Sequence, residues 1–222
     1  MSEPELHVED HPTLSVARLL VASALEGESI VLTGGATVGE AYEEAARLEP
    51  LWPEASLWWS DERCVPPDDE RSNYALVKRT LLDTLALKPA EVHRMRGELP
   101  PPEAADLYER ELERVTLDFL LLALGPDGHV ASLFPGSPQL AVRDRLVTSG
   151  PAGLEPFVDR VTLTLPALLS AHVVVFLVTG AHKAEAVRRA FREPISDDVP
   201  ASLLRTGDAP LIVYLDRAAA GS

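Results

Sequence analysis

The apolar residues of this chain follow two different periods, and the two alternate along its length. In some stretches apolar positions recur every three or four residues, as with Leu14, Ala17, Val21 and Leu25, which is the spacing of one buried helix face. In others the apolar residues are consecutive, which is typical of a strand buried on both sides. The predicted helices are His11–Leu25, Val38–Leu48, Ser72–Leu85, Glu103–Arg114, His182–Phe191 and a short helix at the end of the chain, and the predicted strands are Ser29–Thr33, Ser56–Trp59, Leu117–Leu124, Val161–Leu165, Val173–Thr179 and Leu211–Leu215.

Strands that alternate with helices predict an α/β fold with a mostly parallel sheet. Because the strands are continuous apolar runs, we expect helices on both faces of the sheet, as in a Rossmann-like, doubly wound fold. The 222 residues contain no repeat and no linker, and the one proline cluster, Pro100–Pro102, suits the start of a helix better than a domain boundary. We therefore predict a single α/β domain over residues 1–222.

Four polar motifs directly follow predicted strands. They are Thr33–Thr37, Ser60–Arg63, Gly125–His129 and Thr179–Lys183. Parallel strands present their carboxyl ends at one edge of the sheet, and ligands of such folds bind beyond that edge. The convergence of four such loops predicts a site there.

The first of these loops has two glycines in front of a helix. Gly34 and Gly35 allow the backbone to approach a ligand closely, and Thr37 is expected to cap the helix, with Glu40 completing a capping box. The N–H groups and the dipole of a helix N-terminus favour an anion. The alternative is a tight turn without a ligand, since the loop has neither the Walker spacing nor the dinucleotide fingerprint.

The other loops carry charged side chains that suit catalysis or an anionic ligand. Asp127 and His129 flank a glycine, so that one turn can hold a carboxylate against an imidazole that serves as a general base near neutral pH. Arg63 can bind phosphate or carboxylate with two parallel hydrogen bonds, although a solvated charge cluster is an alternative. Lys183 in the first turn of a helix is unfavourable unless it meets an anion, and the alternative is a surface lysine.

The remaining candidates carry no predicted chemistry. The other five histidines are interpreted as structural, and Cys64, the only cysteine, is expected to be packed rather than nucleophilic. No cluster of His, Cys, Asp or Glu has metal-ligand spacing, so we expect no metal site. A single cysteine also excludes an intrachain disulfide.

Charge restricts the partners of this chain. It has 20 Lys and Arg against 35 Asp and Glu, a formal net charge of −15. Such a chain has no basis for binding nucleic acid non-specifically or for attraction to an anionic membrane surface. The N-terminus does not resemble a signal peptide, and the longest apolar runs are shorter than the about 20 residues that a bilayer requires. We expect a cytoplasmic protein, as a monomer or small homo-oligomer, with no nucleic-acid or membrane partner.

Taken in order, the motifs resemble those of the 6-phosphogluconolactonases, within the glucosamine-6-phosphate isomerase/lactonase superfamily. The matching stretches are Leu32–Thr37, Asp61–Pro66, Ser72–Tyr74, Gly125–Gly136, Arg160–Thr164 and Gly180–Ala184. Two departures lie in and next to the loop Thr33–Thr37, which we call the glycine loop. Ala36 replaces the family's usual serine, and Val38 replaces its proline. One hydroxyl contact to phosphate would be missing, and backbone N–H groups and Thr37 could replace it.

The resemblance implies a NagB-like fold and hydrolysis of 6-phospho-D-glucono-1,5-lactone to 6-phosphogluconate in the oxidative pentose phosphate pathway, with no metal or cofactor and a small sugar phosphate as the partner. On this hypothesis His129 is the general base that activates water, and Asp127 orients it. Asp61 and Arg63 complete the catalytic set, with Arg63 stabilising developing negative charge or holding the substrate. The phosphate would be held by Gly34, Gly35, Ala36, Thr37, Arg160 and Lys183.

Two other functions stay open at this point. A glucosamine-6-phosphate deaminase or isomerase of the same superfamily would carry an acidic residue shortly after the histidine for ring opening, and Val130–Pro135 has none. A catalytically silent sugar-phosphate sensor would keep the anion-binding loops and lose the base, whereas Asp127 and His129 are both present. Because the implied substrate is an anion and the chain is acidic, we predict a small positive pocket on a negative surface.

Overall fold

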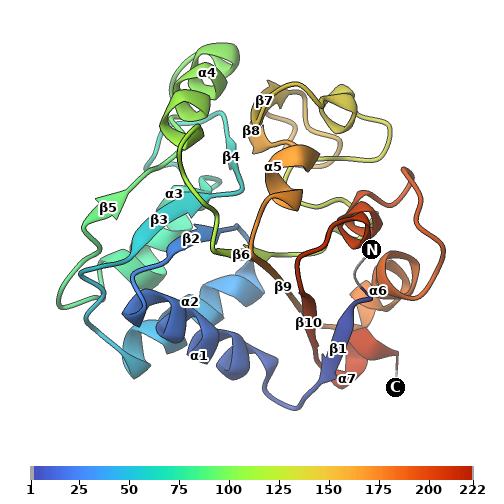
Figure 1. Cartoon of the computed structure of the whole chain (residues 1–222), viewed down its shortest axis with the longest axis horizontal. Helices are drawn as coiled ribbons and strands as arrows, with labels where there is room; N and C mark the ends of the chain where they lie inside the picture. The colour runs from blue at the N-terminus through green and yellow to red at the C-terminus, as the bar shows by residue number, and fades with distance from the viewer. Residues whose placement is uncertain (1–2, 222) are drawn as a thin grey trace.

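A seven-stranded sheet forms the centre of the protein, whose computed structural model describes residues 3–221 (Figure 1). In spatial order its strands are β1 (Glu5–Val8), β10 (Leu211–Leu215), β9 (Val173–Val178), β6 (Phe119–Leu122), β2 (Ser29–Leu32), β3 (Ser56–Trp59) and β5 (Glu91–Val92). Every neighbouring pair in this sheet is parallel. The predicted mostly parallel sheet is therefore confirmed.

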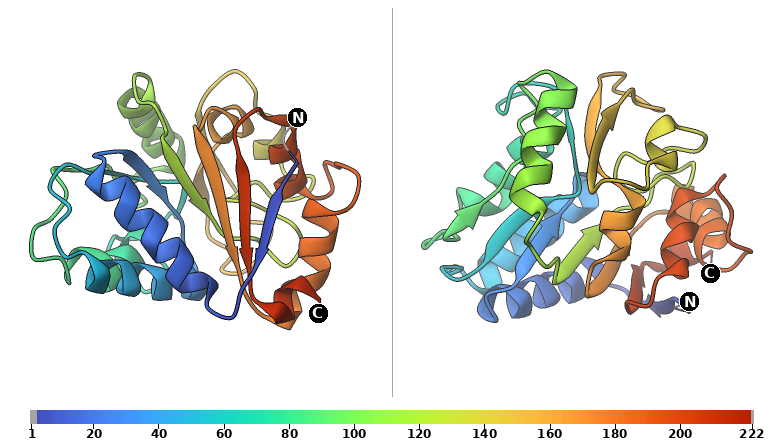
Figure 2. Two further views of the ribbon diagram at one scale, coloured as in Figure 1. Left: turned by 60° about the horizontal axis from the view of Figure 1, so that its bottom comes forward. Right: turned by 45° about the horizontal axis from the view of Figure 1, so that its top comes forward.

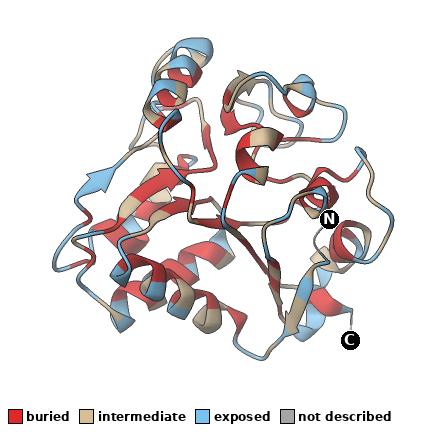
Figure 3. Ribbon diagram, viewed as in Figure 1, coloured by how far each residue is buried: buried red, intermediate tan, exposed pale blue. Residues whose placement is uncertain are grey.

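Helices cover both faces of this sheet, as predicted. Helices α1 (Pro12–Leu25) and α2 (Ala36–Leu48) pack together on one face, and α6 (Ala184–Phe191) lies on the other (Figure 2). On that second face Phe191 of α6 meets Phe176 of β9 with ring centroids 5.1 Å apart. The strands in the middle of the sheet are largely buried, whereas the edge strands β1 and β5 are not (Figure 3). All four residues of β6 are buried, which is why they are apolar.

The other helical segments are all shorter than α1 and α2. They are α3 (Asn73–Val77), a π-helical turn (Lys78–Leu82), α4 (Pro101–Leu112), α5 (Leu165–Leu169), α7 (Arg217–Ala220) and 3-10 segments at Pro138–Ala141, Ala181–Lys183 and Pro200–Thr206. The predicted helix Ser72–Leu85 is thus divided between α3 and the π-helical turn. Ser72 caps α3, because its hydroxyl accepts a hydrogen bond from the N–H of Ala75 at 3.1 Å.

A second, antiparallel sheet contains β4 (Asp61–Arg63), β8 (Arg160–Leu163) and β7 (Val147–Gly150) in that order. The sequence predicts Asp61–Arg63 as part of a loop, and this is wrong. The backbone of β4 is satisfied by pairing with β8, about 100 residues away in the chain, and such distant pairing leaves no apolar pattern in three charged residues.

The capping box predicted at Thr37 and Glu40 is also wrong. Helix α2 begins at Ala36 with Gly35 as its N-cap, and Gly35 has a φ of 129°, which glycine adopts without strain. Thr37 lies inside the first turn, where its hydroxyl is 2.8 Å from that of Thr179. No side chain caps α2, so the N–H groups of its first turn are available to a ligand.

The large sheet reverses its winding direction between β2 and β6. From β2 the chain continues through α2 to β3, and from β6 it continues to β9, which lies on the opposite side. In doubly wound folds a crevice opens where two adjacent strands diverge in this way, and ligands bind in it. The glycine loop follows β2 and Gly125–His129 follows β6, so two of the four predicted loops flank this switch point.

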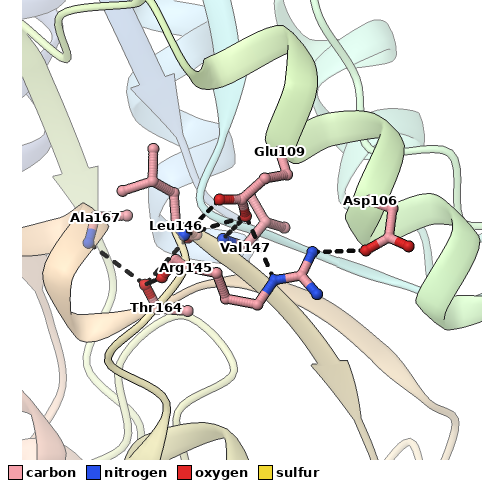
Figure 4. Close-up of polar contacts among 7 residues, drawn as sticks. All are labelled: Asp106, Glu109, Arg145, Leu146, Val147, Thr164 and Ala167. Atoms are coloured by element: carbon pink, nitrogen blue, oxygen red, sulfur yellow. Dashed lines mark hydrogen bonds and ion pairs between the residues drawn. The ribbon is translucent and has the colours of Figure 1, made fainter.

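A polar clamp holds α4 against β7 of the small sheet (Figure 4). The carboxylate of Glu109 on α4 accepts hydrogen bonds from the backbone N–H groups of Leu146 at 2.9 Å and Val147 at 2.6 Å. Arg145 donates to Asp106 of the same helix at 2.7 Å. The clamp therefore fixes the sheet whose other two strands, β4 and β8, carry candidate site residues.

We expect Glu109→Ala to lower the free energy of unfolding by about 1–3 kcal/mol, because two backbone N–H groups lose their acceptor. Denaturant titration measures the change. Glu113→Ala is the matched control, since Glu113 is exposed just beyond the end of α4, and it should change the free energy of unfolding by less than about 0.5 kcal/mol. Equal losses in the two variants would contradict a stabilising role for the clamp.

Candidate active site

A cavity of about 310 Å³ lies at the switch point, between the loops of the large sheet and the strands of the small one. All four predicted loops contribute to its lining. The residues are Thr33, Gly34, Gly35, Asp61, Arg63, Asn73, Ala123, Leu124, Gly125, Pro126, His129, Ala131, Ser132, Phe134, Leu154, Glu155, Arg160 and Lys183. The structure therefore brings most of the sequence-predicted site residues to one cavity.

His129 and Asp127 form a hydrogen-bonded pair beside this cavity. Nδ1 of His129 lies 2.5 Å from Oδ1 of Asp127, which also accepts the backbone N–H of His129 at 3.1 Å. Burial acts to raise the pKa of Asp127, but the hydrogen bond and charge of His129 outweigh it and lower that pKa, so Asp127 stays ionised. With Nδ1 engaged, Nε2 of His129 is the ring nitrogen available to a ligand.

Two neighbours hold the imidazole of His129 in place. Its ring centroid is 4.6 Å from that of Phe134, and its backbone carbonyl accepts the N–H of Gly125 at 2.9 Å. A Cβ on Gly125 would lie 2.0 Å from Nδ1 of His129. Only glycine at position 125 therefore leaves room for the ring where it stands.

Asp61 lies at the centre of a buried polar network in the cavity wall. Its Oδ2 accepts the hydroxyl of Ser132 at 2.6 Å, and its Oδ1 accepts Nδ2 of Asn73 at 3.1 Å. All three residues are buried and all three line the cavity. Ser132 and Asn73 were not among the predicted site residues, although both lie in the motifs that carry the family resemblance, and those motifs were the only signal for them.

The neighbouring Glu62 has a structural role. It is buried, and its carboxylate accepts hydrogen bonds from the hydroxyl of Ser72 and the backbone N–H groups of Arg63, Asn73 and Tyr74 at 2.7–2.9 Å. Burial raises the pKa of Glu62 in spite of these four donors. It does not line the cavity and instead anchors α3 to β4.

Lys183 lies at the large-sheet side of the cavity. Its ammonium donates to the carbonyl of Leu124, two residues beyond the end of β6, at 2.6 Å. Burial lowers the pKa of Lys183, and the charge of Asp127 acts against this. A partly desolvated ammonium has donors to spare for an anion, as the sequence predicts for this position.

Arg63 and Arg160 lie at the small-sheet side, directly opposite each other in the register of β4 and β8. The guanidinium of Arg63 donates to the carbonyl of Arg71, and its buried Nε has no hydrogen-bond partner within residues 3–221. Arg160 donates to the carbonyls of Pro156 at 2.9 Å and Val158 at 2.8 Å. Both arginines thus line the cavity while contacting loop backbone.

Tyr42 fixes Thr33, the first residue of the glycine loop. The hydroxyl of Tyr42 accepts the N–H of Thr33 at 3.0 Å and donates to its carbonyl at 2.8 Å. Gly34 and Gly35 then line the cavity, whereas the predicted phosphate-binding residues Ala36 and Thr37 do not. These two line an adjoining cavity of about 450 Å³, with which the first shares Gly35 and Lys183.

We expect Gly34→Ala to lower the free energy of unfolding by about 1–3 kcal/mol, because the new Cβ would lie 1.9 Å from Oδ1 of buried Asn73. Denaturant titration of Gly34→Ala, Asn73→Ala and the double variant measures this. The double variant should be more stable than the sum of the single changes predicts, since it removes the obstacle. Strict additivity would mean that this contact is not the cause.

The cavity contains both signs of charge. Its cationic side chains are Arg63, Arg160 and Lys183, and its acidic ones are Asp61 and Glu155. The cavity therefore has a small cationic excess in a chain whose formal net charge is −15. The ionised Asp127 beside the cavity offsets this excess, so the positive pocket stays a prediction.

The residues set aside in the sequence lie outside this cavity. Burial raises the pKa of the Cys64 thiol to about 12, so Cys64 is not a thiolate at neutral pH. His182 lines only the adjoining cavity. Among residues 3–221 no group of three or more His, Cys, Asp or Glu side chains is placed to hold a metal ion, and no helix is long and apolar enough to cross a bilayer.

Comparisons with known proteins find matches over most of this chain. The family model described as glucosamine-6-phosphate isomerases/6-phosphogluconolactonase matches residues 14–213. The 6-phosphogluconolactonase of Homo sapiens is 35% identical over 216 residues, which cover 92% of this chain and 84% of that protein. The motifs quoted from the sequence thus lie within one matched region.

Solved structures agree with the fold. A crystal structure of 6-phosphogluconolactonase from Thermotoga maritima is 29% identical, with a TM-score of 0.84 over 98% of this chain and 100% of that one. A monomeric glucosamine-6-phosphate deaminase of the NagB superfamily is 22% identical, with a TM-score of 0.87 over 99% of both chains. The NagB-like fold is confirmed, and the fold alone does not choose between the two chemistries.

Proposed function

Because the chain belongs to the glucosamine-6-phosphate isomerase/6-phosphogluconolactonase family, we propose that it hydrolyses 6-phospho-D-glucono-1,5-lactone to 6-phospho-D-gluconate in the oxidative pentose phosphate pathway. The observation that carries this proposal is the Asp127–His129 pair, with 2.5 Å between Oδ1 and Nδ1, at a cavity with cationic side chains. A lactone is an activated ester, so one positioned base and charge stabilisation supply much of the catalysis it needs.

In the proposed mechanism Nε2 of His129 removes a proton from water as the water oxygen bonds to C1 of the lactone. Asp127 orients the ring and stabilises the imidazolium that forms. The C1 carbonyl oxygen becomes an oxyanion in the tetrahedral intermediate. When the C1–O5 bond breaks, the imidazolium returns its proton to O5, and the open-chain acid then ionises at C1.

The small-sheet side of the cavity is proposed to stabilise the charge that develops at C1. Arg63 lines the cavity there, its guanidinium is held by the carbonyl of Arg71, and a positioned cationic donor stabilises a developing oxyanion. Asp61 is fixed by Ser132 and Asn73, which supports a role in positioning the attacking water or a sugar hydroxyl.

The phosphate is proposed to bind where the two cavities meet. Gly35 and Lys183 line both cavities, and the uncapped first turn of α2 adds backbone N–H groups. Ala36 offers no hydroxyl, and that of Thr37 already shares a hydrogen bond with Thr179, so the backbone carries most of this contact. Arg160 remains a predicted phosphate ligand, although its contacts support a different role that is argued below.

A deaminase of the same family is the second candidate, since the deaminase structure shares the fold. The stretch Val130–Pro135 that follows His129 contains no carboxylate, whereas the ring opening of an amino sugar calls for an acid–base group there. The absence of a carboxylate at these positions supports the lactonase. A silent sensor is disfavoured because the Asp127–His129 pair is intact.

Two assays separate these functions. Lactone prepared in situ is added to the purified protein, and proton release is followed with the spontaneous opening rate subtracted; we expect clear acceleration. Ammonia release from glucosamine 6-phosphate without lactone turnover would assign the deaminase instead. Tight binding of 6-phosphogluconate with neither activity would assign the sensor.

A crystal soaked in 6-phosphogluconate tests the site. We expect the phosphate near Gly35 and Lys183 and the C1 carboxylate within hydrogen-bond reach of His129. A ligand bound elsewhere would overturn the proposed site. We further propose a cytoplasmic enzyme, because a single cysteine excludes an intrachain disulfide, and we propose that it acts as a monomer or a small homo-oligomer.

A further inference from the structure

Arg160 is almost fully buried, with 3% of its surface exposed, yet no carboxylate in residues 3–221 forms an ion pair with it. Its partners are two backbone carbonyls, those of Pro156 at 2.9 Å and Val158 at 2.8 Å. A planar guanidinium is suited to holding two acceptors at once, which a lysine ammonium cannot do in the same geometry. The side chain therefore fixes the loop that leads into its own strand.

The position of Arg160 is costly. Burial, and then the charge of Arg63 opposite it in the register of β4 and β8, lower the pKa of Arg160, although the charges of Asp61 and Glu62 act against this. Like charges directly opposite in an antiparallel pair are destabilising. The hydrogen bonds to the carbonyls of Pro156 and Val158 offset part of the cost of burying this charge. They indicate that Arg160 holds the loop in front of β8.

The loop held by Arg160 forms part of the cavity. Leu154 and Glu155 line it, two residues or fewer before the carbonyl of Pro156 that Arg160 contacts. Phe157, the next residue, is 71% exposed and lies outside the cavity lining. The segment 154–158 thus has one end on the cavity and an aromatic side chain in solvent.

Glu155 is an exposed residue of the lining, and its carboxylate is available to a ligand in a cavity proposed to bind a phosphate ester. A carboxylate repels phosphate, but it is a strong acceptor for sugar hydroxyls. Gly35 and Lys183, the proposed phosphate contacts, follow β2 and β9 of the large sheet, whereas Glu155 belongs to the loop before β8 of the small sheet. The sugar ring, with its uncharged hydroxyls, is the part of the substrate that suits this second side.

We infer that Glu155 is a specificity-determining residue that accepts a hydroxyl of the sugar ring, and that Arg160 is a positioning residue that holds the 154–158 segment in place for it. This inference rests on the proposed lactonase function for the role of Glu155. The role of Arg160 can be tested without measuring lactone hydrolysis.

The first experiment uses Phe157 as a natural probe of the loop. Chymotrypsin is added to the folded wild-type protein, and cleavage after Phe157 is followed by mass spectrometry. Arg160→Lys keeps the charge but loses the planar guanidinium that donates to both carbonyls. We therefore expect cleavage after Phe157 to be about tenfold faster in this variant than in wild type. Arg143→Lys is the control, because Arg143 also donates to two backbone carbonyls, those of Leu140 and Val142, but lies elsewhere, and it should not change cleavage after Phe157. An unchanged rate in Arg160→Lys would overturn the positioning role.

A second measurement separates positioning from phosphate binding. Inorganic phosphate is titrated against wild type and Arg160→Gln, which removes the charge. We expect the two dissociation constants to agree within about twofold. A tenfold weaker affinity in Arg160→Gln would make Arg160 a phosphate ligand and overturn the inference.

The third experiment tests Glu155 with the parent lactone and its 2-deoxy, 3-deoxy and 4-deoxy analogues. Glu155→Ala should lower kcat/KM for the parent about 10- to 100-fold, the range for a lost hydrogen bond to a charged group, and leave it unchanged for one analogue. Equal losses on all four substrates, or no loss, would overturn the role of Glu155. If the wild-type protein does not hydrolyse the lactone, the proposed function fails, while the chymotrypsin measurement still decides the role of Arg160.

Discussion

Replacing His129 by alanine should lower kcat for lactone hydrolysis by about 10²- to 10⁴-fold, the range expected when a general base is removed. Its ring lines the cavity with Nδ1 held 2.5 Å from Asp127, so it is oriented for one task through Nε2. Proton release after addition of fresh lactone measures the rate, with spontaneous opening subtracted from each trace. A rate equal to that of wild type would remove His129 from the mechanism.

Two further variants show whether the effect belongs to the position of the imidazole. Gly125→Ala keeps His129 but places a Cβ 2.0 Å from its Nδ1, so we expect it to lose a large part of the same rate. His172→Ala removes an exposed histidine that pairs with Asp118 at 3.1 Å, and it should leave kcat unchanged. A loss in His172→Ala would indicate that general destabilisation lowers the rate.

Replacing Lys183 by methionine should raise KM for the lactone about 10- to 100-fold and change kcat much less, because the ammonium is proposed to contact a phosphate remote from the reacting carbon. Methionine retains the length and packing of the side chain and loses the charge. Lys183→Arg keeps a cation and should recover part of the affinity. A fall in kcat with KM unchanged would contradict the proposed phosphate contact.

The same lysine predicts a pH dependence of binding. Burial lowers the pKa of Lys183 below the ordinary lysine value, and only the protonated form attracts phosphate. Affinity for 6-phosphogluconate should therefore be full below this lowered pKa and weaken as the pH rises through it, and Lys183→Met should lack that decline. Isothermal calorimetry between about pH 7 and pH 10 measures both curves, and identical curves would exclude titration of Lys183 as the cause.

Much of the fold could be predicted because it depends on burial. β6 and β9 are covered on both faces, so nearly every residue in them is apolar and the runs stand out in the sequence. Once the strands are parallel, their carboxyl ends share one edge, and the meeting of the four loops follows. The 2.5 Å contact between Asp127 and His129 is equally local, since it spans two residues of a single turn.

The small sheet and its contacts could not be predicted in this way. β4 consists of three charged residues, and only pairing with β8 makes it a strand. Ser132 meets Asp61 across 71 residues of sequence, and a hydrogen bond at that separation leaves no pattern in either segment. The cap of α2 was predicted at Thr37 because the residue type suits it, whereas the conformation of Gly35 starts the helix earlier.

The family, the parallel sheet and the loop that joins Asp127 to His129 all follow from the sequence, because each is set by burial or by contacts within a few residues. Which groups the cationic side chains of the cavity contact follows only from the tertiary structure. Lys183, Arg63 and Arg160 are three cations in an acidic chain, and their surroundings differ because Lys183 follows β9 and contacts the carbonyl of Leu124, whereas the two arginines lie in the small sheet and contact its loops. The environment of a charge is decided by packing between segments distant in the chain, and that packing has no local signature in the sequence.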